Sequence, residues 1–518
     1  MQSLLTSAWS KLLFITLKLR LRLLNVREST VPTSEPGVIV IQIDGLGHEV
    51  LTQAMKRGAA PFLRSLVNKN GYTYGSYFCG VPSITTAIEA ELIYGKSDEI
   101  PAYSWFHRGL GRFIRGDQAG QARLLEETVL ARVTHPLMEQ GSAIASAYSG
   151  GATMTNISPE SQAEKSQLRR LLRLRILLVP LLNPFRFWHM IIVMTGSVIV
   201  MLARAVKNKS KALFWDDFWT LLIRLFLCDL AATIAVNDIW RKTPALFINL
   251  PLVDKVSHAH GIRHQIVFQS IRLMDLYCKQ LYDSARVAKR NYQFIVLSDH
   301  GQSPGIPFET ITGETLPQLV NRGVGDRGPK AYLTYGNELT LAENKARNII
   351  FAMPSSSIAH LYFSRWLPDQ ATHETIEKTF PNLIPTLLGH PGIGWIMVKN
   401  NDGTGELLAQ NGSSAIFQKG KVLTVLGKPI DLPDTPSLLV ALARLSQCPN
   451  NGDLVLFGGK QGNAWASFEP YIGTHGSFTG EMVRPFMLTN DPKLSTMRAN
   501  GASHRDLFKR IREMRTNA

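Results

Sequence analysis

Three apolar runs along the chain each stop at an acidic residue. They are VIVIQI before Asp44, FINLPLV before Asp254, and FIVL followed by Ser298 and Asp299. The runs are continuous rather than alternating, which is typical of strands buried on both faces of a parallel sheet. Helical patterns separate them, for example HEVLTQAMKRGAAPFLRSLV after the first. The pattern predicts an α/β fold with a mostly parallel central sheet and helices on both faces.

Polar residues with metal-ligating side chains cluster where these strands end. Because α/β sheets build their sites at the carboxyl ends of strands, we expect these side chains to meet. A further histidine lies between glycines in YIGTHGSFTG, where the backbone can approach a site closely. Three carboxylates and three imidazoles without a thiolate suit two Zn²⁺ ions, with Mn²⁺ as an alternative. The six residues are Asp44, Asp254, His258, Asp299, His300 and His475.

The stretch CGVPSITTAIEAELIYG (79–95) offers hydroxyl groups just before a helical pattern. A hydroxyl at a helix N-terminus faces free N–H groups and the positive end of the helix dipole, which favour an alkoxide and a phosphate. The ordinary alternative is N-capping. The chemistry of this stretch alone leaves the choice between Ser83, Thr85 and Thr86 open.

Charge and cysteine usage narrow the classes of partner. The 518 residues carry a formal net charge of +16, which calls for nucleic acid, an anionic membrane surface or anionic substrates. The basic residues concentrate in an apolar block and no nucleic-acid-binding motif is present, so nucleic acid is the weaker choice. The four cysteines show no CxxC spacing, which argues against a disulfide framework or a cysteine zinc site.

The ordered set IQIDGLG, VPSITTAIEAELIYG, VDKVSHAHG, LSDHG and GTHG resembles the alkaline phosphatase superfamily. Within it, the chain resembles the type I phosphodiesterase/nucleotide pyrophosphatase family over roughly residues 37–490. The phrases SDHGQS and HPGIGW make it similar to bacterial-type members with a helical insert.

The resemblance implies a two-zinc phosphodiesterase that hydrolyses a phosphodiester or pyrophosphate through a phospho-threonine. It selects Thr85 as the nucleophile, three residues after Pro82 and ten before Gly95. It also implies that one zinc is held by Asp254, His258 and His475, and the other by Asp44, Asp299, His300 and the Thr85 oxygen. His260 matches no role in the family and is expected on the surface.

The substrate stays open at the level of sequence. Thr85 is followed by Thr86-Ala87-Ile88 where nucleotide pyrophosphatases have Phe-Pro-Asn, so a lipid headgroup diester and a nucleotide are both candidates. No Arg lies within ten residues after Thr85, which favours a diester over the doubly charged monoester. A phosphomonoesterase or phosphotransferase is the alternative. Cys79 lacks the Cys-x-Pro-x-Arg context of sulfatases. A membrane-associated scaffold without catalysis is the alternative from another class.

A basic and apolar block interrupts the α/β pattern. Residues 165–211 contain ten Lys or Arg residues and no acid, and they enclose the uncharged stretch Phe187 to Ala203. A second apolar stretch, 218–236, carries Arg224 and Asp229. Because Thr85 and Asp254 flank this block and must share one site, a single span is excluded. We expect a monotopic helical hairpin on an anionic leaflet, or else a helical pair packed on the protein body.

The N-terminal residues are also basic and apolar. Its apolar run LLFITL ends at Lys18 and no small-residue cleavage site follows, so a signal peptide is not indicated. We expect membrane association that is peripheral or monotopic rather than spanning, on a side the sequence leaves open. The predicted division is a basic amphipathic segment (1–36), a catalytic domain (37–163 plus 236–500), a helical insert (164–235) and a basic tail (501–518).

Overall fold

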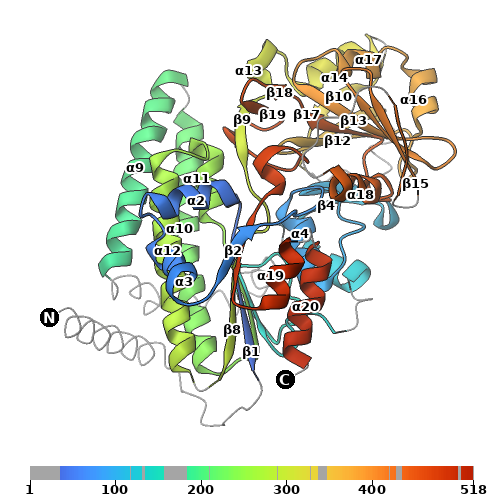
Figure 1. Cartoon of the computed structure of the whole chain (residues 1–518). Coiled ribbons are helices and arrows are strands. Elements are labelled where there is room, and N and C mark those ends of the chain that lie inside the picture. Colours follow the sequence, from blue (N-terminus) through green and yellow to red (C-terminus); the bar gives the residue numbers. More distant parts are fainter. Residues whose placement is uncertain are drawn as a thin grey trace.

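The computed structural model describes residues 36–116, 118, 120–130, 135–156, 184–208, 211–288, 290–326, 328–335, 347–418, 421–426, 435–499 and 503–516. Two large sheets organise this part of the chain, one mostly parallel and one mostly antiparallel. Figure 1 shows the first at the lower centre and the second at the upper right. The predicted basic amphipathic N-terminal segment (1–36) lies outside the described residues, apart from residue 36.

The first sheet is the predicted parallel one. Its central strand β1 pairs in parallel with β7 on one side and with β8 on the other. All seven residues of β1 are buried, as expected for a strand covered on both faces. The mostly parallel sheet is therefore confirmed, with antiparallel pairing only where β21 meets β8 and β2. Its strands in spatial order are β2 (Thr73–Ser76), β21 (Phe486–Thr489), β8 (Tyr292–Leu297), β1 (Gly37–Ile43), β7 (Ala245–Leu250), β5 (Ser142–Ile144) and β6 (Met154–Asn156).

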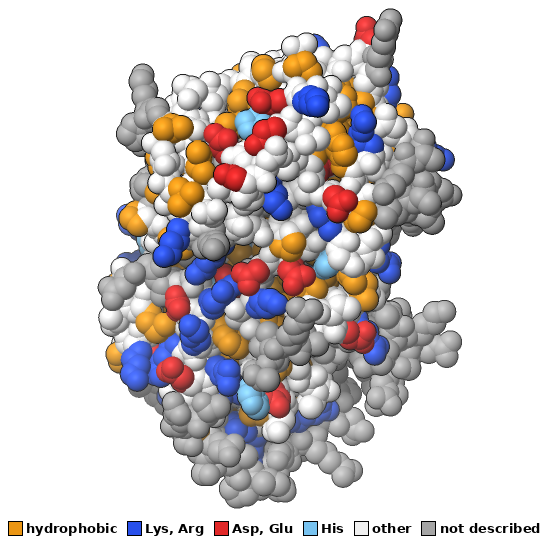
Figure 2. All heavy atoms as spheres, turned by 90° about the vertical axis from the view of Figure 1, so that its right-hand side faces the viewer, with side chains coloured by type: hydrophobic (Ala, Val, Ile, Leu, Met, Phe, Trp, Pro, Cys, Tyr) orange, Lys and Arg blue, Asp and Glu red, His pale blue; other side chains and the backbone are white. Residues whose placement is uncertain are grey.

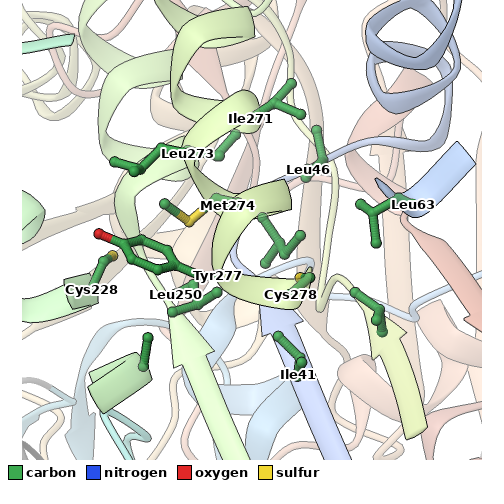
Figure 3. Close-up of a cluster of buried hydrophobic side chains, with 14 of the residues drawn as sticks. Ile41, Leu46, Leu63, Cys228, Leu250, Ile271, Leu273, Met274, Tyr277 and Cys278 are labelled. Atoms are coloured by element: carbon green, nitrogen blue, oxygen red, sulfur yellow. The ribbon is translucent and has the colours of Figure 1, made fainter. Parts of the chain in front are cut away.

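Helices cover both faces of this sheet because side chains of successive strand residues point to opposite sides. Ile39 and Ile41 of β1 enter one buried cluster, whereas Val38 and Val40 enter another. Figure 3 shows part of the first cluster, in which Ile41 lies near residues of α12. The first face is covered by α2 (His48–Lys56), α3 (Pro61–Lys69), α9 (Pro184–Asn208), α10 (Lys211–Trp240), α11 (Leu252–His260) and α12 (Gln265–Val287). The second is covered by α4 (Thr85–Tyr94), α5 (Gln121–Leu125), the π-helical turn η2 (Glu126–Leu130), α19 (Pro492–Ala499) and α20 (His504–Thr516).

The second sheet was not anticipated from the sequence. Its neighbouring strands run antiparallel except for the parallel pair β10 and β11. The strands in spatial order are β10 (Lys330–Leu333), β11 (Ile349–Ser355), β12 (Ile358–Phe363), β17 (Leu454–Gly458), β13 (Ile393–Lys399), β14 (Gly405–Ala409), β15 (Ser414–Gln418) and β16 (Lys421–Leu426). The helices associated with it are α13 (Glu309–Thr312), α14 (Leu316–Val324), α16 (His373–Thr379), α17 (Leu383–Leu388) and α18 (Thr435–Ser446).

Short elements join the two sheets and reach the site. The small sheet is ordered β18 (Lys460–Gln461), β19 (Ala464–Ser467), β9 (Ser303–Pro307) and β20 (Gly473–Thr474). A hairpin of β3 (Ser104–His107) and β4 (Arg112–Arg115) encloses the short helix η1 (Arg108–Leu110), and η4 (Gly480–Val483) precedes β21. At the C-terminus, Leu507, Phe508 and Ile511 of α20 are buried in the same cluster as residues of α4.

Helices α9 and α10 form the described part of the basic, apolar block. α10 packs deeply, since Leu221, Leu225 and Cys228 are almost completely buried. α9 contacts α10 and α12 and lies along the outer left edge of the molecule in Figure 1. Within the described residues, none of the helices has both the length and the apolar character needed to cross a bilayer.

Candidate metal centre and active site

The predicted ligands converge because their parent strands are neighbours. β8, β1 and β7 lie side by side and run in the same direction, so their carboxyl ends meet at one edge. Asp44 follows β1, and Asp299 follows β8. Asp254 was expected at the end of a strand, but β7 stops at Leu250 and Asp254 lies in the first turn of α11.

The first ligand group combines α11 with β20. Asp254 and His258 are four residues apart and therefore share one face of α11. His258 Nε2 lies 3.3 Å from Asp254 Oδ2. His475, directly after β20, places its Nε2 atom 3.1 Å from His258 Nε2 and 3.7 Å from Asp254 Oδ1. Ligand atoms from two elements that are distant in sequence thus lie within 4.8 Å of one another.

The second ligand group adjoins the first. His300 Nε2 lies 3.4 Å from Asp299 Oδ2 and 3.8 Å from Asp44 Oδ1. Ligand atoms of Asp44, Asp254 and His300 also lie within 4.8 Å of one another. Asp254 therefore faces both groups, although the family resemblance assigns it only to the first.

Backbone carbonyls fix the orientation of all three imidazoles. The Nδ1 atoms of His258, His475 and His300 donate to the carbonyl oxygens of Gly473 (2.7 Å), Ser83 (2.8 Å) and Gly301 (3.0 Å), respectively. A histidine that donates through Nδ1 keeps an unprotonated Nε2 for a metal. Each Nε2 atom faces the acidic cluster, which is the orientation a metal site requires.

The acidic groups repel one another in the absence of a cation. Burial raises the pKa of Asp44 well above its usual value, and Asp299 and Asp254 add to this effect. Burial likewise raises the pKa of Asp299 to about 7. Burial and then His300 lower the pKa of His475. Asp299 Oδ2 is buried without a hydrogen-bond partner among the described residues. This donor set fits divalent cations, which would relieve the repulsion and satisfy that oxygen.

Only one of the three candidate hydroxyls faces the ligands. Thr85, the first residue of α4, places its Oγ1 atom 3.2 Å from His300 Nε2 and 3.4 Å from Asp44 Oδ1. Thr86 Oγ1 instead donates to the carbonyl oxygen of Ala102, and Ser83 Oγ donates to that of Ser477. The geometry thus distinguishes Thr85, which the chemistry of the stretch alone could not.

Two other residues discussed from the sequence, His260 and Cys79, occupy buried positions. His260 was expected on the surface, but it is only 7% exposed and its ring lies 5.6 Å from that of His264. That prediction was wrong because α11 packs its C-terminal end into the body. Cys79 is buried, and burial raises the pKa of its thiol well above the usual value. A reactive thiolate at this position is therefore disfavoured.

A buried polar cluster behind the site was missed by the sequence analysis. Glu89 of α4 is completely buried and accepts hydrogen bonds from Gln42 Nε2 (2.9 Å) and Asn249 Nδ2 (3.0 Å). Asn249 also donates to Asp44 Oδ2 at 3.2 Å. Burial raises the pKa of Glu89 to about 8, although the Ala147 N–H and the Ser146 hydroxyl oppose the shift. The available signal was the polar residue within each of two apolar strands, β1 and β7.

A parallel sheet edge that gathers carboxylates, imidazoles and a hydroxyl defines a candidate metal-dependent hydrolase. The family model described as type I phosphodiesterase/nucleotide pyrophosphatase matches residues 38–372. The chain belongs to this family, as its motifs indicated. Membership of this family makes the protein a phosphoester hydrolase.

Two of the solved structures that are similar to this chain are distant in sequence. Phosphonoacetate hydrolase from Sinorhizobium meliloti 1021 in complex with phosphonoformate is 13% identical, with a TM-score of 0.48 and coverage of 94% of this chain and 98% of the other. Murine ectonucleotide pyrophosphatase/phosphodiesterase 5 is 12% identical, with a TM-score of 0.47 and coverage of 93% and 95%. No curated protein matched the sequence.

Proposed function

We propose that this protein is a two-zinc phosphodiesterase in which Thr85 is the nucleophile. The observation that carries the proposal is the convergence of the Thr85 hydroxyl with two adjoining groups of carboxylate and imidazole ligands. Asp254, His258 and His475 would hold one ion. Asp44, Asp299 and His300, with the Thr85 oxygen, would hold the other.

The mixed oxygen and nitrogen donors favour Zn²⁺, with Mn²⁺ as the alternative. When bound, such cations supply positive charge for the phosphoryl oxygens and favour ionisation of a nearby hydroxyl or water. The second ring nitrogen of each histidine is already committed to a backbone carbonyl, so the ligand atoms are oriented before the ions arrive.

Thr85 supplies the attacking oxygen. In the first step Thr85 Oγ1 loses its proton to solvent and bonds phosphorus, while the bond from phosphorus to the leaving alkoxide breaks and the alkoxide takes a proton from solvent. Water then attacks the phospho-threonine, and the Thr85 oxygen leaves. Thr85 begins α4, where free backbone N–H groups and the helix dipole favour the negative charge of the phosphoryl group.

The charges around the site support a diester over a monoester. The first cationic residue after Thr85 is Lys96, beyond the end of α4. In the described part of the chain, the ion pairs of Asp44, Asp254 and Asp299 all involve histidines. A diester carries one negative charge and needs fewer cations than a monoester. A phosphomonoesterase or phosphotransferase is the alternative of the same class.

We further propose that the diester belongs to a molecule at an anionic membrane surface, such as a lipid headgroup. The net charge of +16 and the acid-free block 165–211 support this choice. A nucleotide is the alternative substrate. A panel of phospholipids and nucleotide diesters, assayed with the metal-replete protein, distinguishes the two.

Turnover of a generic aryl phosphodiester tests the chemistry. Thr85→Ala is expected to lower kcat by about a thousandfold or more, because it removes the nucleophile. Thr86→Ala is the matched control, since its hydroxyl bonds a backbone carbonyl on the adjacent segment. Near-normal activity of Thr85→Ala together with loss of activity in Thr86→Ala would show that Thr85 is not the nucleophile. Lack of turnover of every diester by the metal-replete wild type would favour the non-catalytic scaffold.

Elemental analysis tests the metal centre separately. Two zinc-class ions per chain are expected in the wild type, and His475→Ala should preferentially lose one. Asp254 and His258 alone provide too few ligands to hold an ion firmly. A wild type that binds at most one ion would refute the two-metal assignment even if it is active.

A further inference from the structure

The exposed apolar side chains of this protein concentrate on one pair of helices. Of the fourteen large apolar residues that are exposed in the described part of the chain, seven lie on α9 and α10. Five of these belong to α9: Trp188, Ile191, Ile192, Ile199 and Leu202. Exposed fractions reach 62% for both Trp188 and Ile199. Scattered exposed apolar residues are ordinary, but a contiguous set on one element needs a partner.

The five residues form a stripe along α9. At about 100° per residue, their positions fall within roughly 100° of helix circumference. The only other exposed position in that sector between them is Thr195. A surface helix ordinarily turns polar residues outward, and α9 does the opposite.

The stripe is not the side by which α9 attaches to the protein. Val193 and Ser197 lie on the opposite side and are completely buried. Gly196 brings the α9 backbone close to Ile266 of α12, since a Cβ atom there would lie 3.4 Å from Ile266 Cγ1. α9 also contacts the deeply packed α10. α9 therefore keeps its core contacts while the stripe stays available.

Charge decides which partner fits the stripe. α9 contains Arg186, Arg204 and Lys207, and no acidic residue occurs anywhere in 165–211. Apolar side chains, a tryptophan and basic residues without an acidic residue on the same helix are the features of helices that lie in the plane of an anionic bilayer interface. The face seen in Figure 2, on the other side from α9 in Figure 1, instead carries interspersed basic, acidic and apolar side chains.

We propose that the α9 stripe, defined by Trp188, Ile191, Ile192, Ile199 and Leu202, is the surface by which this protein docks on an anionic membrane. The helix lies along the interface with the stripe in the headgroup region, and α10 remains within the protein core. This assignment deepens the proposed membrane location by identifying the docking residues, and it does not depend on the proposed chemistry.

Vesicle flotation of the full chain tests the assignment. The probes are vesicles of phosphatidylcholine and phosphatidylglycerol in equal amounts, and vesicles of phosphatidylcholine alone. We expect the wild type to float with the anionic vesicles, and I191D/I199D to lose at least tenfold in partition coefficient. The matched control is L423D/V425D on β16, where the exposed fractions are 54% and 45%, and its binding should stay within twofold of the wild type.

Further measurements separate docking from folding and from self-association. The melting temperature of I191D/I199D should match that of the control; if it does not, the single variant W188S replaces it, with an expected threefold or greater loss. A wild type that does not float, or variants that float as it does, would overturn the proposal. Equal binding to both vesicle types would overturn its electrostatic part. A wild-type dimer in light scattering that I191D/I199D converts to monomer would assign the stripe to a second copy of the chain.

Discussion

Replacing Gly473 by Ala is expected to disable the first ligand group without removing a ligand. Gly473 begins β20, and its carbonyl oxygen accepts the hydrogen bond that orients His258. A Cβ atom at this position would lie 2.4 Å from the carbonyl oxygen of Ser257 and 2.5 Å from Gln302 Oε1. The Gln302 side chain has some freedom to move, but Ser257 O belongs to the backbone of α11. The substitution therefore pushes β20 away from α11.

The displacement can be estimated from these contacts. Contacts of a Cβ atom below 3.4 Å are tighter than ordinary van der Waals contact, so relief from 2.4 Å requires a separation of about 1 Å. The 2.7 Å bond from His258 Nδ1 to Gly473 O would then lengthen beyond the hydrogen-bonding range. Overpacking of this kind costs roughly 1–3 kcal/mol of stability. Loss of a hydrogen bond that orients a metal ligand lowers metal affinity or activity about 10–100-fold.

Metal affinity is the informative assay because it is local to the site. Purified Gly473→Ala protein would be titrated with Zn²⁺ in competition with a chelator, alongside turnover of a soluble diester and the melting temperature. Gly109→Ala is the control, since the nearest atom to its added Cβ lies 3.6 Å away. We expect the control to match the wild type in all three measurements.

The reasoning fails if Gly473→Ala binds both ions with wild-type affinity and turns over normally. That result would mean that β20 and α11 absorb the methyl group without moving His258. A large fall in melting temperature with unchanged metal affinity would equally refute the proposed link between this contact and the ligand.

Three further predictions concern the surroundings of the site. The Ala147 N–H donates to the Glu89 carboxylate at 2.6 Å, and Glu89→Gln places an amide opposite this donor. The substitution should lower the free energy of unfolding by about 1–3 kcal/mol, measured by chemical denaturation, and should also lower kcat. Burial lowers the pKa of His504 from 6.5 to about 4, so the unfolded chain binds more protons between these values. The free energy of unfolding should therefore fall as the pH drops from 6.5 to 4, by about 1.4 kcal/mol per unit, and His504→Gln should flatten that dependence. Arg108 Nη2 lies 3.1 Å from the buried Asp453 Oδ1, so Arg108→Met should destabilise the protein by about 3–5 kcal/mol, measured as a lower melting temperature.

Much of the candidate site could be predicted because its pattern is local. β1 and β8 are largely apolar strands, and each is followed within two residues by a predicted ligand, Asp44 and Asp299. Parallel strands then bring their carboxyl ends to one edge whatever the distance in sequence. The buried bridge from Glu89 through Asn249 to Asp44 was not predictable in this way. Its three members come from separate elements and meet only after the sheet and α4 have packed.

The second sheet also could not be predicted from local sequence patterns. Partners such as β12 and β17 lie far apart in the chain. Local patterning carries no information on such pairing, because register is decided by contacts across the sheet. The parallel sheet was easier to predict, since each of its central strands has an unmistakably buried composition.

The block 165–236 separates the two contributions most clearly. By itself the sequence indicated that residues 165–211 are basic and that the apolar stretches 187–203 and 218–236 form helices, because composition and periodicity are properties of the chain. It could not distinguish the roles of its two apolar stretches. Packing decided that α10 fills the core with Leu221, Leu225 and Cys228, whereas α9 buries one side and leaves its apolar stripe exposed. The burial of a side chain depends on the residues that pack against it. For α9 and α10 these residues belong to strands and helices that are remote in sequence. Only the tertiary structure could therefore assign one helix to the core and the other to the surface.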